Sequence, residues 1–506
     1  RAIAQMEPPI VSVEEGDIIL KMGSKVNALD LEKYSKFLNL TVKDRNLLPK
    51  RVFITLGTFL FSVIYITLIM PGFWRDSSRA GIVSVAILAN LGLSRFILEL
   101  GGTDLFGENA LLVGLLPNLL PVAFASMIVM TTVGPRMATL TALMTSIFHA
   151  SMQNAGIDVF ATGFSSALVG AFFCREVRLR GAALKAGALA GLTAAVMAVG
   201  LGIASGSGAF ASVNHAGISL LIGVFTGALV LGAMPLMENI FKVATDATLF
   251  ELTDFNHPLL RKMQIEAPGS YHHSLMVANL SENAAIAVGA NPILCRAASL
   301  FHDIGKMTQP HYFTENQGEF DNPHEQKNPS MSALIIKSHV KEGIDMAREH
   351  RLPKILRDVI RQHHGTTLVK YFYYQAQEKM KQETLGLGDM ESVKPDESTY
   401  RYDGPKPRFK ESAIIFFADS VEAAARSLPK VTQHSIEELL ENIFNDRLED
   451  GQLDECPLTL EEVSKIKRSF VKTTLNMLHS RIEYPSEEKT NGKRKDTHTP
   501  FNESTS

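Results

Sequence analysis

The sequence predicts an all-α protein in which a polytopic membrane domain is followed by a separate helical domain. Charge distribution is the first reason, because residues 52–237 hold only 14 of the 103 Asp, Glu, Lys and Arg residues in the 506-residue chain. Length is the second reason: a helix crosses a bilayer with about 20 apolar residues, and this region has room for about seven such helices. A purely soluble protein is therefore excluded.

The net charge and the number of cysteines exclude some classes of function and of site. The net charge is −3 and the pI is about 6.6, whereas a dedicated nucleic-acid binder usually carries a basic surplus, so no nucleic-acid polymer is expected as a partner. The three cysteines, Cys174, Cys295 and Cys456, are too few and too scattered for a disulfide framework or a Cys-based zinc site.

Residues 1–50 are expected to be the C-terminal end of an extracellular domain. Short apolar runs at 10–13 and 18–21 flank a polar turn and predict a β-hairpin, and residues 30–40 predict a short amphipathic helix. The chain begins at Arg1 without a signal peptide, and about 50 residues make a poor independent core. We therefore expect that an upstream extracellular portion is missing from this chain.

The membrane domain is expected to cover residues 51–238. Its third span contains Pro117 and Pro121, which predict a kinked or broken helix. Its sixth span is rich in Gly and Ala, and residues 187–191 offer a small face for close helix packing. The predicted spans are 52–70, 81–98, 110–133, 137–154, 158–174, 184–204 and 217–237.

Loop charges predict the orientation of these spans. The loops on the side of the C-terminal half carry Arg and Lys, whereas the opposite loops carry only acidic residues, although Lys50 and Arg51 lie on that opposite side. The positive-inside rule then places residues 1–50 outside and the C-terminal half in the cytoplasm. The basic residues of the inner loops are Arg75, Arg79, Arg136, Arg175, Arg178, Arg180 and Lys185.

Ionisable residues inside the predicted spans are few. Arg95 and Glu99 lie one turn apart near the outer end of the second span. We expect them to pair with each other rather than to mark a signal-sensing site. The scarcity of other ionisable residues argues against a transporter, whose spans should hold such residues near the bilayer midplane.

Residues 239–484 have the composition of an ordinary helical domain, and the polar tail at 485–506 is expected to be disordered. Residues 243–253 are expected to link the last span to this domain, and residues 385–409, which contain several Gly and Pro, to form a loop. The predicted helices are 271–288, 292–301, 329–349, 353–363, 367–384, 410–427, 436–446 and 459–482.

Ten of the fifteen histidines lie between His257 and His364. Five of these ten, with two aspartates, lie on or at the end of predicted helices beside apolar residues, so each is expected to point into the bundle. A lone buried histidine is more often a hydrogen-bonded core residue, but several imidazoles and carboxylates from separate helices are what a two-metal centre in a helix bundle needs. The candidate ligands are His273, His302, Asp303, His339, His363, His364 and Asp419.

This ordered set resembles the HD phosphohydrolase superfamily, which is named after its His-Asp dipeptide and has a helical fold. Residues 267–285, 362–366 and 404–407 further resemble the seven-transmembrane HD-domain family of PgpH-type phosphohydrolases. The resemblance covers nearly the whole chain. It implies a cytoplasmic HD domain at 239–484, a place in the bacterial inner membrane and hydrolysis of cyclic di-AMP to 5′-pApA.

The resemblance also implies roles for individual residues. His273, His302, Asp303 and Asp419 would hold one metal, and Asp303 would bridge to a second metal held by His339, His363 and His364. Ser270 is a minor departure, because Thr is common there. The seven residues His273, His302, Asp303, His339, His363, His364 and Asp419 leave no sign of a degenerate, non-catalytic copy.

General chemistry is consistent with that assignment. Two divalent ions can activate a shared hydroxide and neutralise charge on phosphoryl oxygens, and a His-rich shell favours Mn²⁺ or Fe²⁺ over Mg²⁺. Asp303 is therefore a catalytic candidate. Lys306, three residues later, is the second, although a salt bridge to a nearby acid explains it equally well.

Other readings remain as alternatives. Cyclic di-GMP hydrolases of HD type carry Gly-Tyr-Pro after the His pair, whereas Gly365-Thr366-Thr367 follows it here. A membrane receptor whose HD domain binds a nucleotide second messenger without cleaving it is disfavoured by the full ligand set. The expected partners are cyclic di-AMP and the lipid bilayer. A homo-oligomer is compatible with the sequence, and the extracellular signal and the oligomeric state stay open.

Overall fold

A computed structural model describes residues 26–43, 48–101, 115–175, 181–206, 208–317, 322–384 and 394–478. Within these ranges the backbone forms helices and no strand, apart from an isolated bridge between Leu368 and Arg401. The all-α prediction is therefore confirmed for the described residues. The expected β-hairpin at 10–21 and the tail at 485–506 lie outside them.

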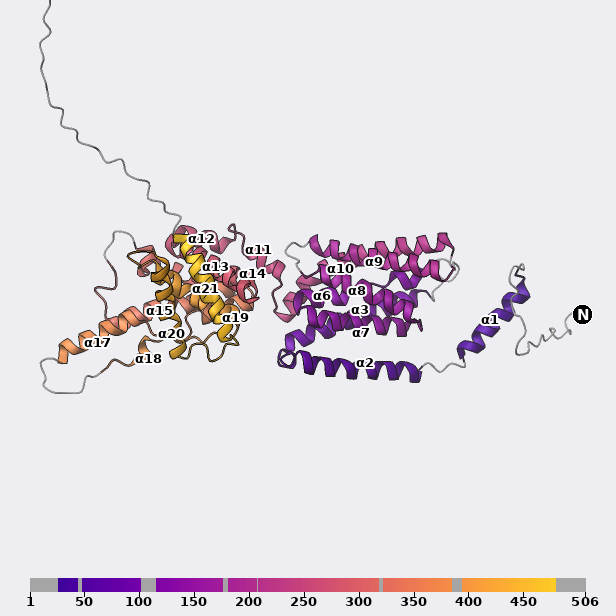
Figure 1. Cartoon of the computed structure of the whole chain (residues 1–506), viewed down its shortest axis with the longest axis horizontal. Helices are drawn as coiled ribbons and strands as arrows, with labels where there is room; N and C mark the ends of the chain where they lie inside the picture. The colour runs from indigo at the N-terminus through magenta and orange to yellow at the C-terminus, as the bar shows by residue number, and fades with distance from the viewer. Residues whose placement is uncertain are drawn as a thin grey trace, which may run out of the picture. The chain divides into compact units, whose positions relative to one another are not determined.

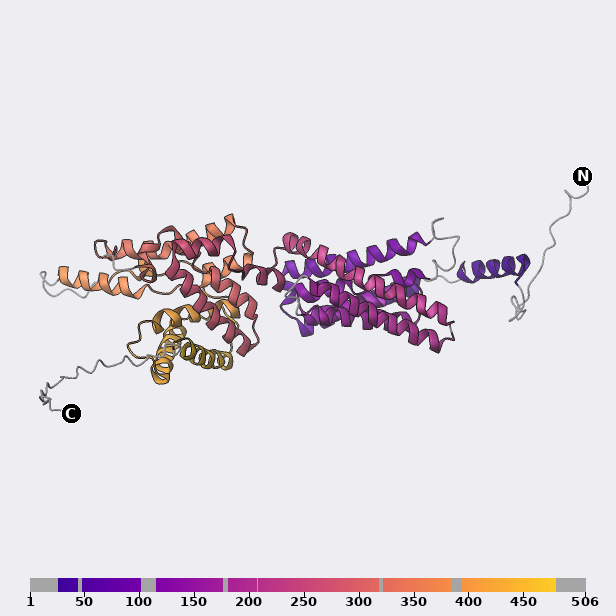
Figure 2. The same cartoon turned by 90° about the horizontal axis from the view of Figure 1, so that it is seen from above.

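The chain divides into two compact units, Arg1–Phe241 and Lys242–Ser506. Figures 1 and 2 show most helices of each unit gathered into a bundle. In the first unit, the short helix α1 (Ala28–Lys43) precedes the apolar helices.

Apolar helices occupy the predicted membrane region. Four of them are long and apolar enough to cross a bilayer, namely α2 (Leu48–Ile69), α3 (Ser77–Leu100), α9 (Gly181–Ala204) and α10 (Ala209–Phe241). Two shorter helices, α7 (Pro135–Met152) and α8 (Ile157–Phe173), lie at the fourth and fifth predicted spans. The number of seven crossings stays a prediction.

The third predicted span is broken, as its prolines indicate. The 3-10 helix η3 (Leu116–Leu119) ends before Pro121, and α6 (Phe124–Thr132) begins three residues later. A break inside a membrane frees backbone carbonyls that need hydrogen-bond donors. Buried Asn90 of α3 supplies one, because its Nδ2 donates to the carbonyl oxygen of Pro121 at 2.7 Å.

Helices α9 and α10 pack in direct backbone contact. A Cβ added at Gly187 or Gly191 would collide with the backbone of α10, and a Cβ at Gly223 or Gly227 would collide with α9. Such small residues let helix axes approach closely where no hydrophobic effect drives association. The small face predicted at 187–191 is therefore confirmed as a packing surface.

Helix α10 ends at Phe241 and is followed by a residue with a left-handed backbone. Lys242 has φ +55°, a region that residues other than Gly rarely adopt. Residues 243–245 are not helical, and the next helix is α11 (Asp246–Leu252). Residues 243–253, which were predicted to link the last span to the second domain, therefore consist mostly of this helix.

The second unit is a helical bundle around a large hydrophobic core, with a smaller buried cluster that includes Phe372 and Tyr400. Phe301, Phe417, Phe444 and Phe470 are buried in the large core, and the rings of Phe417 and Phe444 stack at 3.9 Å. Its further helices are α12 (Pro258–Glu266), α13 (Pro268–Val288), α14 (Pro292–Phe301), α15 (Pro329–Glu349), α16 (Lys354–Gln362), α17 (Lys370–Thr384), α18 (Glu397–Tyr400), α19 (Lys410–Ala425), α20 (Gln433–Glu449) and α21 (Leu460–Leu478).

Most predicted helices of this unit are present. Asn291 and Asn328 cap α14 and α15 with their side chains, each followed by Pro, and both helices begin and end as predicted. Three short helices were not among the predictions: α11 lies in the predicted link at 243–253, α12 has no counterpart, and α18 lies inside the predicted loop at 385–409.

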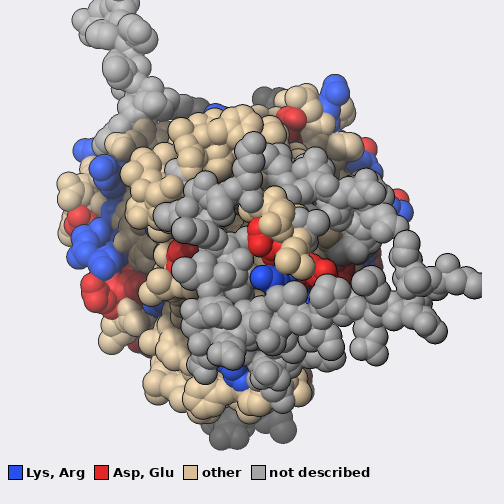
Figure 3. Space-filling model, turned by 90° about the vertical axis from the view of Figure 1, so that its right-hand side faces the viewer, with Lys and Arg blue, Asp and Glu red and all other residues tan. Residues whose placement is uncertain are grey.

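Surface charges are mixed on the face that Figure 3 shows. Described Lys and Arg side chains lie there among Asp and Glu side chains and form no broad patch of one sign.

Candidate metal centre

Asp303 lies at the centre of a buried cluster in the second unit. It caps the 3-10 helix η4 (Ile304–Thr308), directly after α14, and is 1% exposed. Four imidazole Nε2 atoms from α13, α15 and the ends of α14 and α16 lie 3.3–3.5 Å from its carboxylate oxygens, and they belong to His273, His302, His339 and His363.

The structure brings all seven predicted ligands together in two groups that share Asp303. One group is His273, His302, Asp303 and Asp419, and the other is Asp303, His339, His363 and His364. Within each group one donor atom per residue lies within 4.8 Å of the others. This is the division into two sites that the sequence resemblance implies.

Three of the histidines are oriented by their own helices. The Nδ1 atoms of His302, His339 and His363 donate to backbone carbonyls three residues earlier, at 2.7, 2.6 and 2.7 Å. A carbonyl oxygen only accepts, so each Nδ1 carries a proton, and the neutral form of each ring has its lone pair on Nε2. This is the tautomer that a metal ligand needs, fixed by an outer hydrogen bond.

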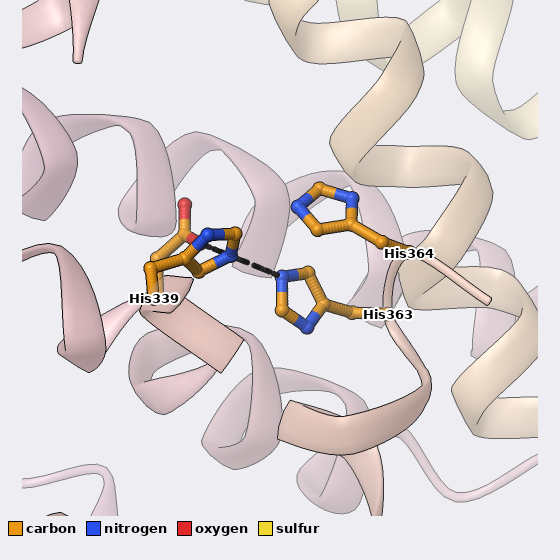
Figure 4. A group of neighbouring side chains, drawn as sticks. His339, His363 and His364 are labelled. Carbon is orange, nitrogen blue, oxygen red and sulfur yellow. Dashed lines mark hydrogen bonds and ion pairs between the residues drawn. The ribbon is translucent and has the colours of Figure 1, made fainter. Parts of the chain in front are cut away.

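His339 and His363 face each other through these lone pairs. Their Nε2 atoms lie 3.2 Å apart, as the dashed line in Figure 4 shows. Burial lowers the pKa of His339 to about 3, so its ring is neutral at neutral pH. When both rings are neutral and both Nδ1 protons are engaged, no proton lies between the Nε2 atoms, and a cation there would satisfy both lone pairs.

Other polar atoms of the cluster also lack partners. His302 Nε2 and Asp303 Oδ1 are buried and make no hydrogen bond. Leaving such atoms unpaired costs about 1–3 kcal/mol each, and more for charged groups. Together with the N and O donors of the set, these unpaired atoms fit divalent transition-metal ions.

A glutamate that the sequence analysis did not single out orients His273. Glu422 Oε2 accepts a hydrogen bond from His273 Nδ1, and its Oε1 accepts one from Arg426 Nε at 2.7 Å. Burial lowers the pKa of His273, but its contacts with Asp419 and Glu422 outweigh burial and raise it. A carboxylate behind a ligating imidazole is the usual outer partner at metal sites.

His364 completes the second group from a more open position. Its Nδ1 lies 3.5 Å from Asp419 Oδ2, and its ring stacks on Tyr402 with centroids 4.2 Å apart. Figure 4 shows His364 and His363 projecting from adjacent positions at the end of α16, with His339 opposite.

Lys306 makes the salt bridge that the sequence analysis considered. Its Nζ lies 2.7 Å from Asp303 Oδ2 and 2.8 Å from Glu315 Oε1. Burial lowers the pKa of Lys306, but the two carboxylates outweigh burial and raise it. Its side chain is 12% exposed and lines a cavity of about 370 Å³ with Phe313, Tyr402 and Arg426, so the ammonium also faces the space next to the cluster.

Gly305 allows Asp303 to reach α15. A Cβ at Gly305 would overlap the backbone of His339 and Gly343. The segment after Asp303 therefore lies directly on α15, which carries His339. A side chain at position 305 would separate Asp303 from His339.

Comparison with known proteins agrees with this architecture. Residues 49–245 match the family described as "7TM receptor with intracellular HD hydrolase", and residues 270–424 match the HD domain. The two matches follow each other in the order that the sequence analysis predicted.

The chain belongs to the seven-transmembrane HD-domain family.

Two relatives in this family are named "Cyclic-di-AMP phosphodiesterase PgpH". The one from Bacillus subtilis (strain 168) is 40% identical over 377 residues, which are 72% of this chain and 51% of that protein. The one from Listeria monocytogenes is 38% identical over 377 residues, 73% of this chain and 50% of that protein. The chain spans about half the length of these curated relatives.

Solved structures of the same family were also found. The crystal structure of the L. monocytogenes phosphodiesterase PgpH HD domain is 45% identical and covers 44% of this chain and 100% of its own, with a TM-score of 0.40. A second structure, of that domain in complex with cyclic di-AMP, has the same identity and TM-score and covers 45% of this chain.

Proposed function

We propose that this member of the seven-transmembrane HD-domain family is a metal-dependent phosphodiesterase that hydrolyses cyclic di-AMP to 5′-pApA. The observation that carries the proposal is the buried cluster of five histidines and two aspartates around Asp303, with unpaired lone pairs at its centre. The names of the two relatives and the solved complex with cyclic di-AMP support the substrate.

The residues that would hold two divalent cations follow from the two groups. His273, His302 and Asp419 would hold one, His339, His363 and His364 the other, and Asp303 would contact both. Mn²⁺ and Fe²⁺ suit this mixture of nitrogen and oxygen donors better than Mg²⁺ does. When bound, such ions supply Lewis acidity toward phosphoryl oxygens and lower the pKa of a water molecule.

The protein contributes position and charge around that chemistry. The hydrogen bonds at Nδ1 hold the imidazoles in place before substrate arrives, so little reorganisation remains for the reaction. Lys306 and Arg426 line the adjacent cavity and would bind phosphate oxygens of the dinucleotide. Phe313 and Tyr402 line the same cavity and would contact a base.

The apolar helices and the family indicate that the chain is a multi-pass membrane protein. We place it in the bacterial inner membrane. The basic loops on the side of the second unit support a cytoplasmic site. A dinucleotide made in the cytoplasm would then reach the site without crossing the bilayer.

The test is hydrolysis by the full chain in lipid nanodiscs. After treatment with a chelator the protein should be inactive, and added Mn²⁺ or Fe²⁺ should restore the conversion of cyclic di-AMP to 5′-pApA. Chromatography measures this conversion. Asp303→Ala should reduce the rate at least about a hundredfold, because it removes the residue common to both groups.

His350→Ala is the matched control. His350 lies at the end of α15 and also bonds a carbonyl of its own helix, but it is exposed and outside the cluster. Its loss should leave hydrolysis unchanged. If the wild-type chain binds cyclic di-AMP but leaves it intact with both metals, the chain is a nucleotide receptor instead.

A further inference from the structure

The first unit contains a cavity that the proposed hydrolysis does not use. It has a volume of about 570 Å³ and lies between η3, α7, α8, α9 and α10. Sites for small molecules commonly measure about 300–1,000 Å³ and combine apolar walls with a few polar groups. Ala, Gly and aliphatic side chains make most of this wall, and the polar residues in it include Asn118, His149, Asp158, Ser166, His215 and Ser219.

Three of these polar side chains are linked to one another by hydrogen bonds. Asn118 of η3 donates from Nδ2 to His215 Nδ1 at 2.5 Å, and its Oδ1 accepts from Ser219 Oγ at 3.4 Å. His215 and Ser219 lie one turn apart on α10. The broken third span thus places a polar side chain against a membrane helix, where polar residues usually serve a function.

His149 of α7 is a second, independent sign of a ligand. It is 2% exposed, and its Nε2 lies 2.7 Å from Ser94 Oγ. Its Nδ1 has no hydrogen-bond partner among the described residues. An unpaired polar atom in such a site costs about 1–3 kcal/mol, and a ligand with a polar group in the cavity would remove that cost.

The charged residues that line this cavity indicate which charge a ligand would carry. Asp158, in the first turn of α8, is exposed and is the one charged residue of the described lining, which contains no Lys or Arg. Lys50 and Arg51 line a separate cavity. A phosphate or carboxylate would therefore meet a like charge and no cation in this cavity, whereas an ammonium group would meet a carboxylate at its edge.

We propose that the membrane unit binds a small organic amine with an apolar body in this cavity. The ammonium group pairs with Asp158, and the apolar body lies among the Ala and Gly residues of α9 and α10. Neither the amine nor its site depends on the proposed hydrolysis, because every lining residue belongs to the first unit.

The test uses three probes of one shape and different charge: 1-adamantanamine, 1-adamantanol and adamantane-1-carboxylate. Saturable binding of radiolabelled probe is measured with the full chain in phosphatidylcholine nanodiscs, with empty nanodiscs as the blank for partition into lipid. The amine should bind about one molecule per chain and at least about tenfold more tightly than the carboxylate.

Four variants locate the binding. Asp158→Asn should remove the preference for the amine but keep binding of the alcohol. Ser219→Leu and Ala194→Leu each place a larger side chain in the lining from a different helix, and both should abolish binding. Val213→Leu changes a position of α10 that is 66% exposed and outside the lining, and it should bind like the wild type.

Thermal unfolding of each variant checks that it is folded. If Ser219→Leu or Ala194→Leu does not unfold like the wild type, the other of these two variants is used. The proposal is overturned if no probe binds saturably, or if amine and carboxylate bind equally. It is also overturned if both well-folded Leu variants at 194 and 219 bind as the wild type does.

Discussion

Asp303 and Glu422 differ in how visible their roles are in the sequence. Asp303 follows a histidine at the end of an apolar run, so the dipeptide itself attracts attention. Glu422 lies three residues after Asp419 on α19 and orients His273 from behind. Glu422 contacts the candidate metal ligand His273 rather than a metal ion. Its spacing of three residues from Asp419 was the one signal in the sequence that could have identified it.

Glu422→Gln should weaken metal binding while preserving the fold. The amide keeps an oxygen that accepts from His273 Nδ1 but removes the negative charge that makes the imidazole more basic. Losses of about 10–100-fold in metal affinity are usual for such outer partners. Metal titration followed by calorimetry measures the change.

The control for that change is Glu437→Gln. Glu437 is an exposed glutamate on α20 that accepts from Gln433. It should leave metal affinity unchanged. Equal affinity of the Glu422→Gln chain and the wild type would show that Glu422 has only a packing role.

The seven ligand positions could be found from the sequence because His and Asp are costly to bury without a partner. Their division into two groups came from the family resemblance, since spacing along the chain does not reveal which helices meet. Glu315, which pairs with Lys306, lies in the three-residue 3-10 helix η6 (Thr314–Asn316), and Tyr402, which stacks on His364, lies outside the helices. No periodic pattern marks such residues.

At the scale of elements, close contact between α9 and α10 depends on glycine. Gly223→Val should destabilise the membrane unit, because a Cβ at this position overlaps the backbone of Gly187 and Gly191. Overpacking of a tight contact costs about 1–3 kcal/mol. Thermal unfolding in detergent should show a lower midpoint for this variant.

Gly232→Val provides the comparison on the same helix. Nothing lies within 4 Å of a Cβ added at Gly232, so this variant has the same change in helix propensity without the collision. The difference between the two midpoints therefore reports packing alone. Equal midpoints would mean that the two helices separate without loss of stability.

Helix boundaries were predictable where local chemistry marks them. Asn caps followed by Pro identified the starts of α14 and α15, and Pro117 with Pro121 identified the break before α6. The short helices α11, α12 and α18 lack a long apolar period. Their helical state depends on packing against the core, which a local pattern does not contain.

At the scale of the whole molecule, the second unit has a core of its own. Its main core cluster runs from Leu249 to Phe470, and every candidate ligand belongs to this unit. A piece comprising residues 242–484 should therefore fold, bind metal and hydrolyse cyclic di-AMP without the membrane helices. Circular dichroism and the chromatographic assay measure folding and activity. A folded but inactive piece would mean that the membrane unit completes the site.

The left-handed backbone at Lys242 has a consequence for the passage between the two units. An L-residue in this conformation is about 1–2 kcal/mol less stable than in a right-handed helix, and glycine would avoid that penalty. The chain thus passes from α10 to α11 through a mildly strained non-helical segment instead of one continuous helix. A rotation of α10 about its own axis is therefore not transmitted rigidly to α11. Any such motion must pass through the backbone torsions of the non-helical residues between the two helices.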